Sequence, residues 1–597
     1  MPDEIRLKFQ TIHAVRGSVH KNLWLSWLQG GDPIFLPALS EHTIDVEASE
    51  HSTAFLQWRF NAAADTSVHL TATYSEGFEL EPVSYPYLRN KADRLDSSKG
   101  RLLGPFDEVN IAIPASRGNT YEPFWFRTFR ILRLKLIVGP QPVKFVSMIG
   151  TQTNYPLDVK ASWKDADDKQ SEQMWDVSIR TLRNCIFDGY SDCPFYEQLQ
   201  YSMDSRAVGL FHYFLSGDDR LIRQSLVNFA ASTTAEGLTQ SRFPSHVNQI
   251  IAAFPLYFIL QVSDHHLFFG DTAFTRKFVP RIDGILQFFE QHIDHRGLVS
   301  NLPSDVWQFV DWVTPWRATD EHPDKGVPTS GRKPNLHTYF SLLYSYVLQQ
   351  AADLLHQVGR PGNAAEYLAR ANALNEAARQ YCFDGTFFSD SILDIADGIS
   401  SRSQHCQVFA ILCGAVVPIE RAPLLREAFA PDSAFSKCSY MMQFYTLRAF
   451  ALAGDAEYEG YYRRVWDPWR SMLDNNLSTW EEDDVRHRSD CHAWGSVPIY
   501  EYATEVAGIQ VVQAGCTRIL FRPRVRLSRE IHAKVALGRT NVAHVDWKWN
   551  DEETSVSVQL SLEQPVEVTS LLPGQQQLTT HGKVVKLELL YRGSLSS

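Results

Sequence analysis

The first 155 or so residues show the alternation of apolar and polar positions that is characteristic of β-strands. Residues 68–74, VHLTATY, are apolar at every second position, which is typical of a strand with one buried face. Further short apolar runs occupy residues 55–60, 108–113 and 129–138. The pattern predicts an N-terminal β-sandwich over residues 1–160.

After a polar stretch at 164–173, the apolar positions recur with the 3.6-residue period of a helix. One face of the segment 336–358 carries apolar residues at 336, 340, 343, 347, 351, 354 and 358, and the pattern stops near Gly359 and Pro361. About a dozen such segments lie between 174 and 506. Twelve helices suit six hairpins closed into an all-α (α/α)6 barrel. A superhelical array of hairpins is the alternative, but the sequence lacks the 34-residue repeat that would favour it.

Strand-like alternation returns at about residue 507. Residues 545–549 and 556–562 both alternate, and Asn550-Asp551 between them supplies a turn, so we expect a hairpin here. The predicted fold class is therefore a multidomain chain. We expect an all-α barrel over 174–506, between an N-terminal β-sandwich and a C-terminal β-sandwich over 507–597.

Composition and charge narrow the possible partners of this chain. Its 597 residues are 44% hydrophobic and 21% charged, close to the globular average, which excludes a disordered or fibrous protein. The net charge of -12 and the lack of a basic tract argue against nucleic acid. We find no apolar run long enough to span a membrane and no apolar leader at the N-terminus. The expected location is the cytoplasm, or outside the cell if a signal was removed.

The cysteines and the known short motifs give no sign of a cofactor or a metal. The eight cysteines include no CxxC pair. This pattern indicates free thiols of a cytosolic protein, and not a disulfide framework or a zinc site. The chain also has no P-loop, no GxGxxG after a strand and no GxSxG elbow. We therefore expect neither a nucleotide cofactor nor a bound metal.

A first cluster of acidic and aromatic residues occupies 188–206, DGYSDCPFYEQLQYSMDSR. If a helix begins near the proline of this segment, Glu197, Tyr201 and Asp204 share one face, and Asp192 precedes it in the N-cap position. Two or three carboxylates would then converge beside an aromatic ring. The alternative without function is that Asp192 caps the helix while the other two acids lie on a solvated face.

A second cluster lies at 478–502, where four consecutive acids at 481–484 follow Trp480 and precede His492 and Trp494. A solvated acidic loop would need no function. Carboxylate and imidazole groups could also bind a metal, but no HExxH or EF-hand spacing supports this.

The third candidate, DVWQFVDWVTPWR at 305–317, contains three tryptophans and two aspartates. Trp307 and Trp312, on either side of Asp311, could form a platform for a sugar ring. Core packing is the alternative for each tryptophan.

Together these segments resemble α-L-rhamnosidases of glycoside hydrolase family 78, within the six-hairpin glycosidases. Residues 192–204, DCPFYEQLQYSMD, resemble the family segment in which DCP is followed by a Glu, an aromatic and an Asp. Residues 479–495, TWEEDDVRHRSDCHAWG, resemble the later segment in which Trp-Glu precedes Ser-x-x-His-x-x-Gly. The phrase FVDW at 309–312 and the segment 254–271 are also similar to the family.

The resemblance implies an exo-acting, inverting hydrolase for terminal α-L-rhamnose on glycosides or oligosaccharides, with no cofactor. It makes Glu197 the general acid and Glu481 the general base. The remaining residues that it and the aromatic clusters assign to the substrate are Asp192, Tyr201, Asp204, Trp307, Asp311, Trp312, Trp480, His492 and Trp494. Tyr201 stands where the family usually has Trp, which is a departure at a position that holds the sugar.

The chemistry sets a geometric expectation for the two glutamates. An inverting hydrolase needs a protonated and an ionised carboxyl on opposite sides of the bond, roughly 6.5–9.5 Å apart. Glu197 should then be the drier group and Glu481 the ionised one, both lining a single pocket with Asp192 and Asp204. Two other functions remain open: an exo-glycosidase of the same fold for a different terminal sugar, and a carbohydrate-binding protein without catalysis. The sequence does not predict the oligomeric state.

Overall fold

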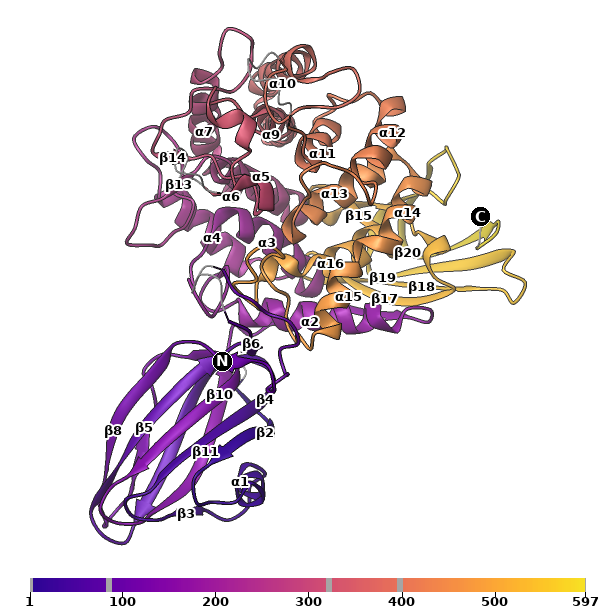
Figure 1. Ribbon diagram of the computed structural model, residues 1–597. Helices are drawn as coiled ribbons and strands as arrows, with labels where there is room; N and C mark the ends of the chain where they lie inside the picture. The colour runs from indigo at the N-terminus through magenta and orange to yellow at the C-terminus, as the bar shows by residue number, and fades with distance from the viewer. Residues whose placement is uncertain (1–3, 82–87, 318–324, 394–400, 596–597) are drawn as a thin grey trace.

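The computed structural model describes residues 4–81, 88–317, 325–393 and 401–595. It is about 36% helix and 28% strand, with large curled sheets and a six-hairpin domain. The predicted fold class, an all-α barrel between two β-sandwiches, is therefore wrong, because the strands form large curled sheets beside the six-hairpin domain. Figure 1 shows the N-terminal sheet below the helices and the C-terminal sheet beside them.

The N-terminal strands form one curled, nine-stranded sheet, because a single long strand belongs to both of its halves. Strand β4 (Glu41–Ala62) is 22 residues long. Its first half pairs with β2 and β10, and its second half pairs with β9 and β11. The strands of this sheet are β1 (Glu4–Arg6), β2 (Phe9–Arg16), β3 (Ile34–Leu36), β4, β5 (Thr66–Ser75), β8 (Phe106–Ile113), β9 (Asn119–Tyr121), β10 (Arg127–Val138) and β11 (Val143–Thr153). Helix α1 (Lys21–Leu28) packs against it through Trp24 and Trp27.

The helical domain contains a ring of six neighbouring helices. Each of α3, α5, α9, α11, α13 and α16 contacts the next, and α16 contacts α3 again. Their bounds are α3 (Ser202–Ser216), α5 (Phe254–Phe269), α9 (Thr338–Gln357), α11 (Gln404–Leu412), α13 (Tyr440–Ala453) and α16 (Val497–Glu501). The helix predicted between 336 and 358 is confirmed as α9.

Other helices lie outside this ring, and most of them contact one of its members. They are α2 (Lys169–Asn184), α4 (Arg220–Ala231), α6 (Thr272–Arg276), α7 (Val279–Gln291), α8 (Thr329–Arg332), α10 (Pro361–Cys382), α12 (Pro418–Ala428), α14 (Asp455–Val465) and α15 (Asp467–Asp474). The ring helices are apolar on nearly every side, as in α3, where all residues are buried, whereas the outer α10 buries only one stripe. Apolar burial on both sides is what holds the inner helices in place. Among the described residues no helix is long and apolar enough to cross a membrane.

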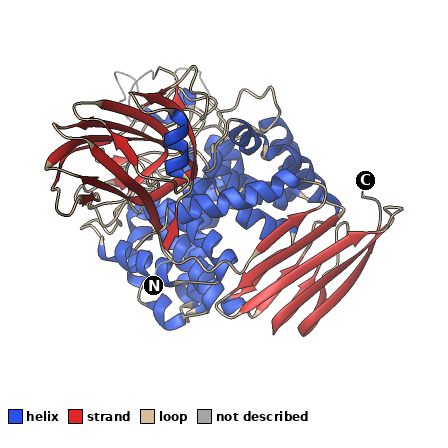
Figure 2. Ribbon diagram, turned by 90° about the horizontal axis from the view of Figure 1, so that it is seen from below, coloured by secondary structure: helices blue, strands red, loops and turns tan. Residues whose placement is uncertain are grey.

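The C-terminal strands form a seven-stranded sheet (Figure 2). The predicted hairpin is confirmed as the antiparallel pair β18 (Asn541–Trp549) and β19 (Ser555–Ser570). The other strands are β12 (Ser162–Asp165), β15 (Ile509–Gln513), β16 (Arg518–Phe521), β17 (Glu530–Leu537) and β20 (Thr579–Arg592). Strand β12 precedes the helical domain in sequence but pairs with β17. The chain thus ties its C-terminal sheet to the start of the helices.

Candidate active site

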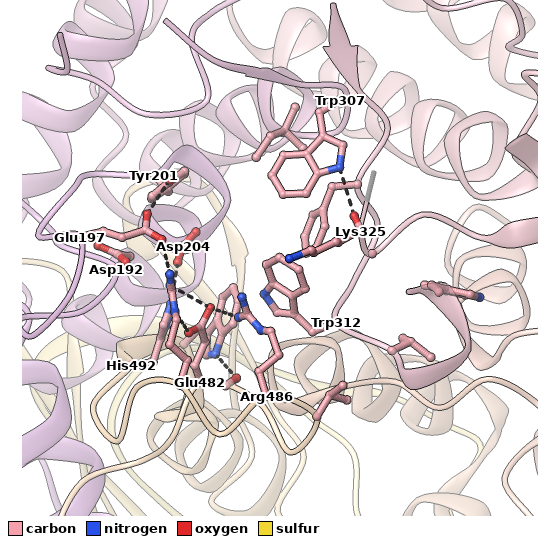
Figure 3. A pocket seen from close by; sticks show the side chains of 18 of the residues that line it. Asp192, Glu197, Tyr201, Asp204, Trp307, Trp312, Lys325, Glu482, Arg486 and His492 are labelled. Carbon is pink, nitrogen blue, oxygen red and sulfur yellow. Dashed lines mark hydrogen bonds and ion pairs between the residues drawn. The ribbon is translucent and has the colours of Figure 1, made fainter. Parts of the chain in front are cut away.

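A cavity of about 750 Å³ opens in the helical domain, a size that suits a small ligand. Its walls come from the segment before α3, the loop before α5, residues 306–317 and residues 482–494. Leu88 and Arg89, which lie in the chain between strands β5 and β8 of the N-terminal sheet, also line it. Eight of the residues predicted from the sequence line this cavity, namely Asp192, Glu197, Tyr201, Asp204, Trp307, Trp312, His492 and Trp494. Figure 3 shows most of them around the open space.

The segment 192–201 is a tight loop and not the start of a helix. Asp192 accepts a hydrogen bond from the Leu199 backbone N–H (2.9 Å) and so closes the loop. Gln198 has a positive φ of 57°, which interrupts any helix here, and α3 begins only at Ser202. The predicted helix start near residue 194 is therefore wrong, but the loop still directs Glu197 and Tyr201 into the cavity.

Glu197 lies on the more open side of the cavity, with its side chain 26% exposed. The Tyr201 hydroxyl donates to its Oε2 (2.7 Å), and Arg488 donates from Nη1 to its Oε1 (2.8 Å). Both oxygens are therefore held in defined positions. Glu481, by contrast, is 6% exposed, so the expectation that Glu197 is the drier of the two is wrong.

Glu482 is the second glutamate of the cavity wall. Arg488 donates to it from Nε (3.0 Å), and Arg486 forms a further ion pair with it. Burial alone would raise the pKa of Glu482, but Arg486 and Arg488 lower it to about 2. Glu482 is therefore ionised throughout the neutral pH range.

Glu481 does not line this cavity, which corrects the prediction that it faces Glu197. Its carboxylate accepts from Tyr440 Oη (2.8 Å), Arg94 Nη2 (3.1 Å) and His487 Nδ1 (3.0 Å). It borders a second, smaller cavity of about 260 Å³. Residues 480–482 are not helical, and consecutive side chains point apart here as they do in an extended chain.

The contact with Arg94 joins Glu481 to the N-terminal part of the chain. Arg94 and Lys91 follow β6 (Phe78–Glu79) and are both buried. Both of them bind Asp490, at 3.0 and 3.1 Å. Such a buried network fixes the N-terminal segment against the helical domain, since each charge needs its partner. Glu481 thus serves the junction between domains.

The deep wall of the cavity is formed by Asp192, Asp204 and His492, all at least 95% buried. Burial and then the charge of Glu197 raise the pKa of Asp192 to about 7, and burial with the charge of Asp192 raises that of Asp204. Burial lowers the pKa of His492 to about 3, so its ring is neutral. His492 Nε2 lies 3.5 Å from Asp204, and the ring stacks on Trp494. These groups can exchange hydrogen bonds with hydroxyls at little cost in charge.

The raised pKa of Asp192 makes stability depend on pH. Between about 3.9, its value in an unfolded chain, and about 7, the folded protein keeps a proton that the unfolded chain has released. The free energy of unfolding should therefore fall as pH rises through this window. We expect Asp192→Asn to reduce the slope of the free energy of unfolding against pH by up to the amount that corresponds to one bound proton. Urea denaturation at several pH values measures this slope. Equal slopes for both proteins would show that Asp192 titrates normally.

The aromatic residues predicted to hold substrate divide into two groups. Trp307 and Trp312 line the cavity, and Arg486 lies 3.4 Å from the ring centroid of Trp312. Trp480 is fully buried, and its Nε1 donates to Ser178 (2.9 Å). Trp480 is therefore a core residue, which corrects its assignment to the substrate.

Asp311 also lies outside the lining of the cavity. It accepts hydrogen bonds from His405 Nε2 (2.7 Å) and the Ser439 backbone N–H (2.9 Å). Burial alone would lower the pKa of His405, but Cys438 and Asp311 raise it to about 10. Asp311 is thus the partner of a buried imidazolium, and its role is to hold the loop that carries Trp312.

The two tryptophans form a matched pair of variants. Trp312→Ala should raise KM by about three- to tenfold, because stacking on one aromatic face is lost. Trp480→Ala should instead lower the free energy of unfolding by about 3–5 kcal/mol. Thermal unfolding and initial rates, measured on both variants, separate the effects. A large loss of stability in Trp312→Ala would mean that Trp312 is a core residue too.

The sequence analysis missed seven charged residues of the cavity, namely Arg89, Arg242, Arg317, Lys325, Glu482, Arg486 and Arg488. The last three lie inside the acidic segment that was singled out, where VRHR follows EEDD. A run of acids followed at once by two arginines was a usable signal of ion pairing. Arg242 has no such signal, since it lies alone in a polar loop. Among the described residues no group of His, Cys, Asp and Glu could hold a metal ion.

Comparison with known proteins now identifies the helical domain. Residues 159–434 match the model of the bacterial alpha-L-rhamnosidase six-hairpin glycosidase domain. A search of curated proteins found no match. These results, with the structural matches below, confirm the resemblance predicted from the sequence.

Solved structures share the fold at low sequence identity. The family 78 rhamnosidase of Bacillus sp. GL1 has a TM-score of 0.79 at 21% identity, and the match covers 93% of this chain and 56% of that one. The Klebsiella oxytoca rhamnosidase with rhamnose bound gives 0.65 at 18%, over 84% and 96%. The Streptomyces avermitilis α-L-rhamnosidase complexed with L-rhamnose gives 0.67 at 16%, over 98% and 53%. Residues 159–434 of this chain thus resemble the bacterial α-L-rhamnosidase six-hairpin glycosidase domain, and the solved rhamnosidase structures share its fold.

Proposed function

We propose that this protein is an exo-acting glycoside hydrolase that releases terminal α-L-rhamnose with inversion. Glu197 is the general acid and Glu482 is the general base. The observation that carries the proposal is that these two carboxylates bind one guanidinium, that of Arg488, on the wall of a cavity in a rhamnosidase-type domain. Relatives of this fold are described with rhamnose bound, which supports the choice of sugar.

The shared arginine limits the distance between the two carboxylates. Arg488 Nη1 lies 2.8 Å from Glu197, and its Nε lies 3.0 Å from Glu482. Two such hydrogen bonds across one guanidinium place the bound oxygens at most about 8 Å apart. Inverting glycosidases need roughly 6.5–9.5 Å, which leaves room for a water on the far side of the sugar. The upper limit of about 8 Å lies inside this range, so an acid at Glu197 and a base at Glu482 are compatible with inversion.

The reaction proceeds as a single displacement. Protonated Glu197 donates its proton to the glycosidic oxygen, and the bond from the anomeric carbon to that oxygen breaks. Ionised Glu482 removes a proton from a water, whose oxygen attacks the anomeric carbon from the opposite face. The products are β-L-rhamnose and the free aglycone. Asp192, Asp204 and His492 hold the sugar hydroxyls during this step.

A panel of nitrophenyl glycosides tests the proposal. The α-L-rhamnoside should be hydrolysed in preference to other deoxy and neutral sugars, and proton NMR should detect the β anomer first. A retained α anomer would mean that one carboxylate acts as a nucleophile. Preference for another sugar would assign a different exo-glycosidase activity, and binding of rhamnose without turnover would indicate a carbohydrate-binding protein.

A further inference from the structure

Arg242 lines the cavity, and its side chain lacks an acidic partner among the described residues. Its Nη1 donates to the Tyr201 hydroxyl (3.0 Å), and its guanidinium lies 5.9 Å from the centre of that ring. Its buried Nε has no hydrogen-bond partner in the described part of the chain. By contrast, Arg486 and Arg488 are both paired with Glu482. Arg242 is therefore a cation whose pairing is incomplete in the free protein.

A second unsatisfied group lies near Arg242 in the sequence and lines the same cavity. The side-chain Oε1 of Gln249 is buried and accepts no hydrogen bond from the described residues. Buried polar atoms are nearly always paired in folded proteins. Both side chains line the cavity, so a ligand there meets a guanidinium that suits an anionic acceptor and an amide that suits a hydroxyl.

The position of Arg242 relative to Glu197 identifies the part of the substrate it meets. The Tyr201 hydroxyl connects the two, at 2.7 Å from Glu197 and 3.0 Å from Arg242, and Figure 3 shows Tyr201 beside Glu197. The acid lies next to the glycosidic oxygen, and the deeply buried Asp192, Asp204 and His492 hold the terminal sugar. Arg242 is more exposed than these groups. It therefore lies where the first unit of the aglycone begins.

We infer that the aglycone carries a carboxylate, as in a rhamnosyl uronate, and that Arg242 binds it. The inference rests on the proposed function and deepens it. A carboxylate fits a guanidinium with two parallel hydrogen bonds. Arg242 itself offers one positive charge, which suits the single negative charge of a carboxylate. The overall charge of -12 would repel an anionic substrate from most of the surface. A cationic group inside the cavity would therefore favour binding of the anion at that position.

The test compares substrates that differ only in this charge. The rates kcat/KM are measured for α-L-rhamnosyl-glucuronate, for its neutral methyl ester, and for nitrophenyl α-L-rhamnoside. The wild-type protein should prefer the acid over the ester by about tenfold or more, because one charge-assisted pair is lost in the ester. The preference should weaken as salt is added. Equal rates for acid and ester would overturn the inference, while hydrolysis of the nitrophenyl rhamnoside would leave the proposed function standing. No hydrolysis of any rhamnoside would instead refute the function.

Variants then assign the preference to one residue. Arg242→Gln should bring the ratio of kcat/KM for acid and ester close to one. Arg242→Lys should retain part of the preference, because lysine keeps the positive charge but cannot donate two parallel hydrogen bonds. Arg317→Gln is the matched control. Arg317 lines the same cavity, but among the described residues it is Arg242 that binds Tyr201, so the ratio for Arg317→Gln should stay at the wild-type value. If Arg317→Gln removes the preference and Arg242→Gln keeps it, Arg242 is not the carboxylate site. The wild-type ratio needs no variant, so a folding failure would not leave the substrate class untested.

Discussion

Glu482→Gln is expected to lower kcat by about 10²–10⁴-fold with little change in KM, because a general base contributes that much and acts only in the transition state. Two properties of Glu482 lead to this expectation. It lines the cavity, and it is ionised because its pKa is lowered to about 2. Glu482 also pairs with the buried Arg486 and Arg488, so Glu482→Gln should lower the free energy of unfolding by about 3–5 kcal/mol as well, and kcat is therefore compared for the folded fraction of each variant. Initial rates with nitrophenyl α-L-rhamnoside, together with thermal unfolding, measure both properties.

Glu481→Gln is the matched control for this variant. Glu481 is the neighbouring residue of the same type, but it binds Arg94, His487 and Tyr440 away from the cavity. Its replacement leaves buried cations without their partner, so the free energy of unfolding should fall by about 3–5 kcal/mol. The folded fraction should keep kcat within about tenfold of the wild type. The opposite outcome, a stable Glu481→Gln without activity beside an active Glu482→Gln, would restore Glu481 as the base.

Glu197→Gln is expected to show an effect that depends on the leaving group. For a rhamnosyl disaccharide, whose sugar oxygen leaves poorly without a proton, kcat should fall by about 10²–10⁴-fold. For 2,4-dinitrophenyl α-L-rhamnoside the loss should be small, because that leaving group needs no proton. The ratio of the two losses, measured on the same variant, isolates proton donation from binding.

Asp204→Asn provides the comparison for Glu197→Gln. Asp204 lies on the deep wall beside His492, where it would hold the sugar and not the leaving oxygen. Its replacement should therefore slow both substrates by a similar factor. A uniform loss in Glu197→Gln, equal for the disaccharide and the activated aryl glycoside, would show that Glu197 binds substrate but does not protonate it.

The sequence by itself determined the local structure and the approximate location of the site. The period of the apolar positions predicted α9 and the hairpin of β18 and β19, because that period reports which side of an element is buried. The clusters at 188–206 and 478–502 were correctly identified as parts of one cavity. Glu197 and Glu482, 285 positions apart, both line it, and only the family resemblance suggested that the two clusters would meet.

The tertiary structure decided which side chain of each cluster faces the cavity and how the strands are joined. Glu481 and Glu482 are chemically alike, and an irregular loop has no period from which to predict direction. Glu481 turns away because Arg94, 387 positions earlier, holds it, and that contact exists only in the folded chain. Trp480 and Asp311 are buried for the same reason, through partners at Ser178 and His405. Likewise, alternation along a strand reveals a buried face but not its neighbours, so the sharing of β4 between two halves of one curled sheet depends on hydrogen bonds between distant strands.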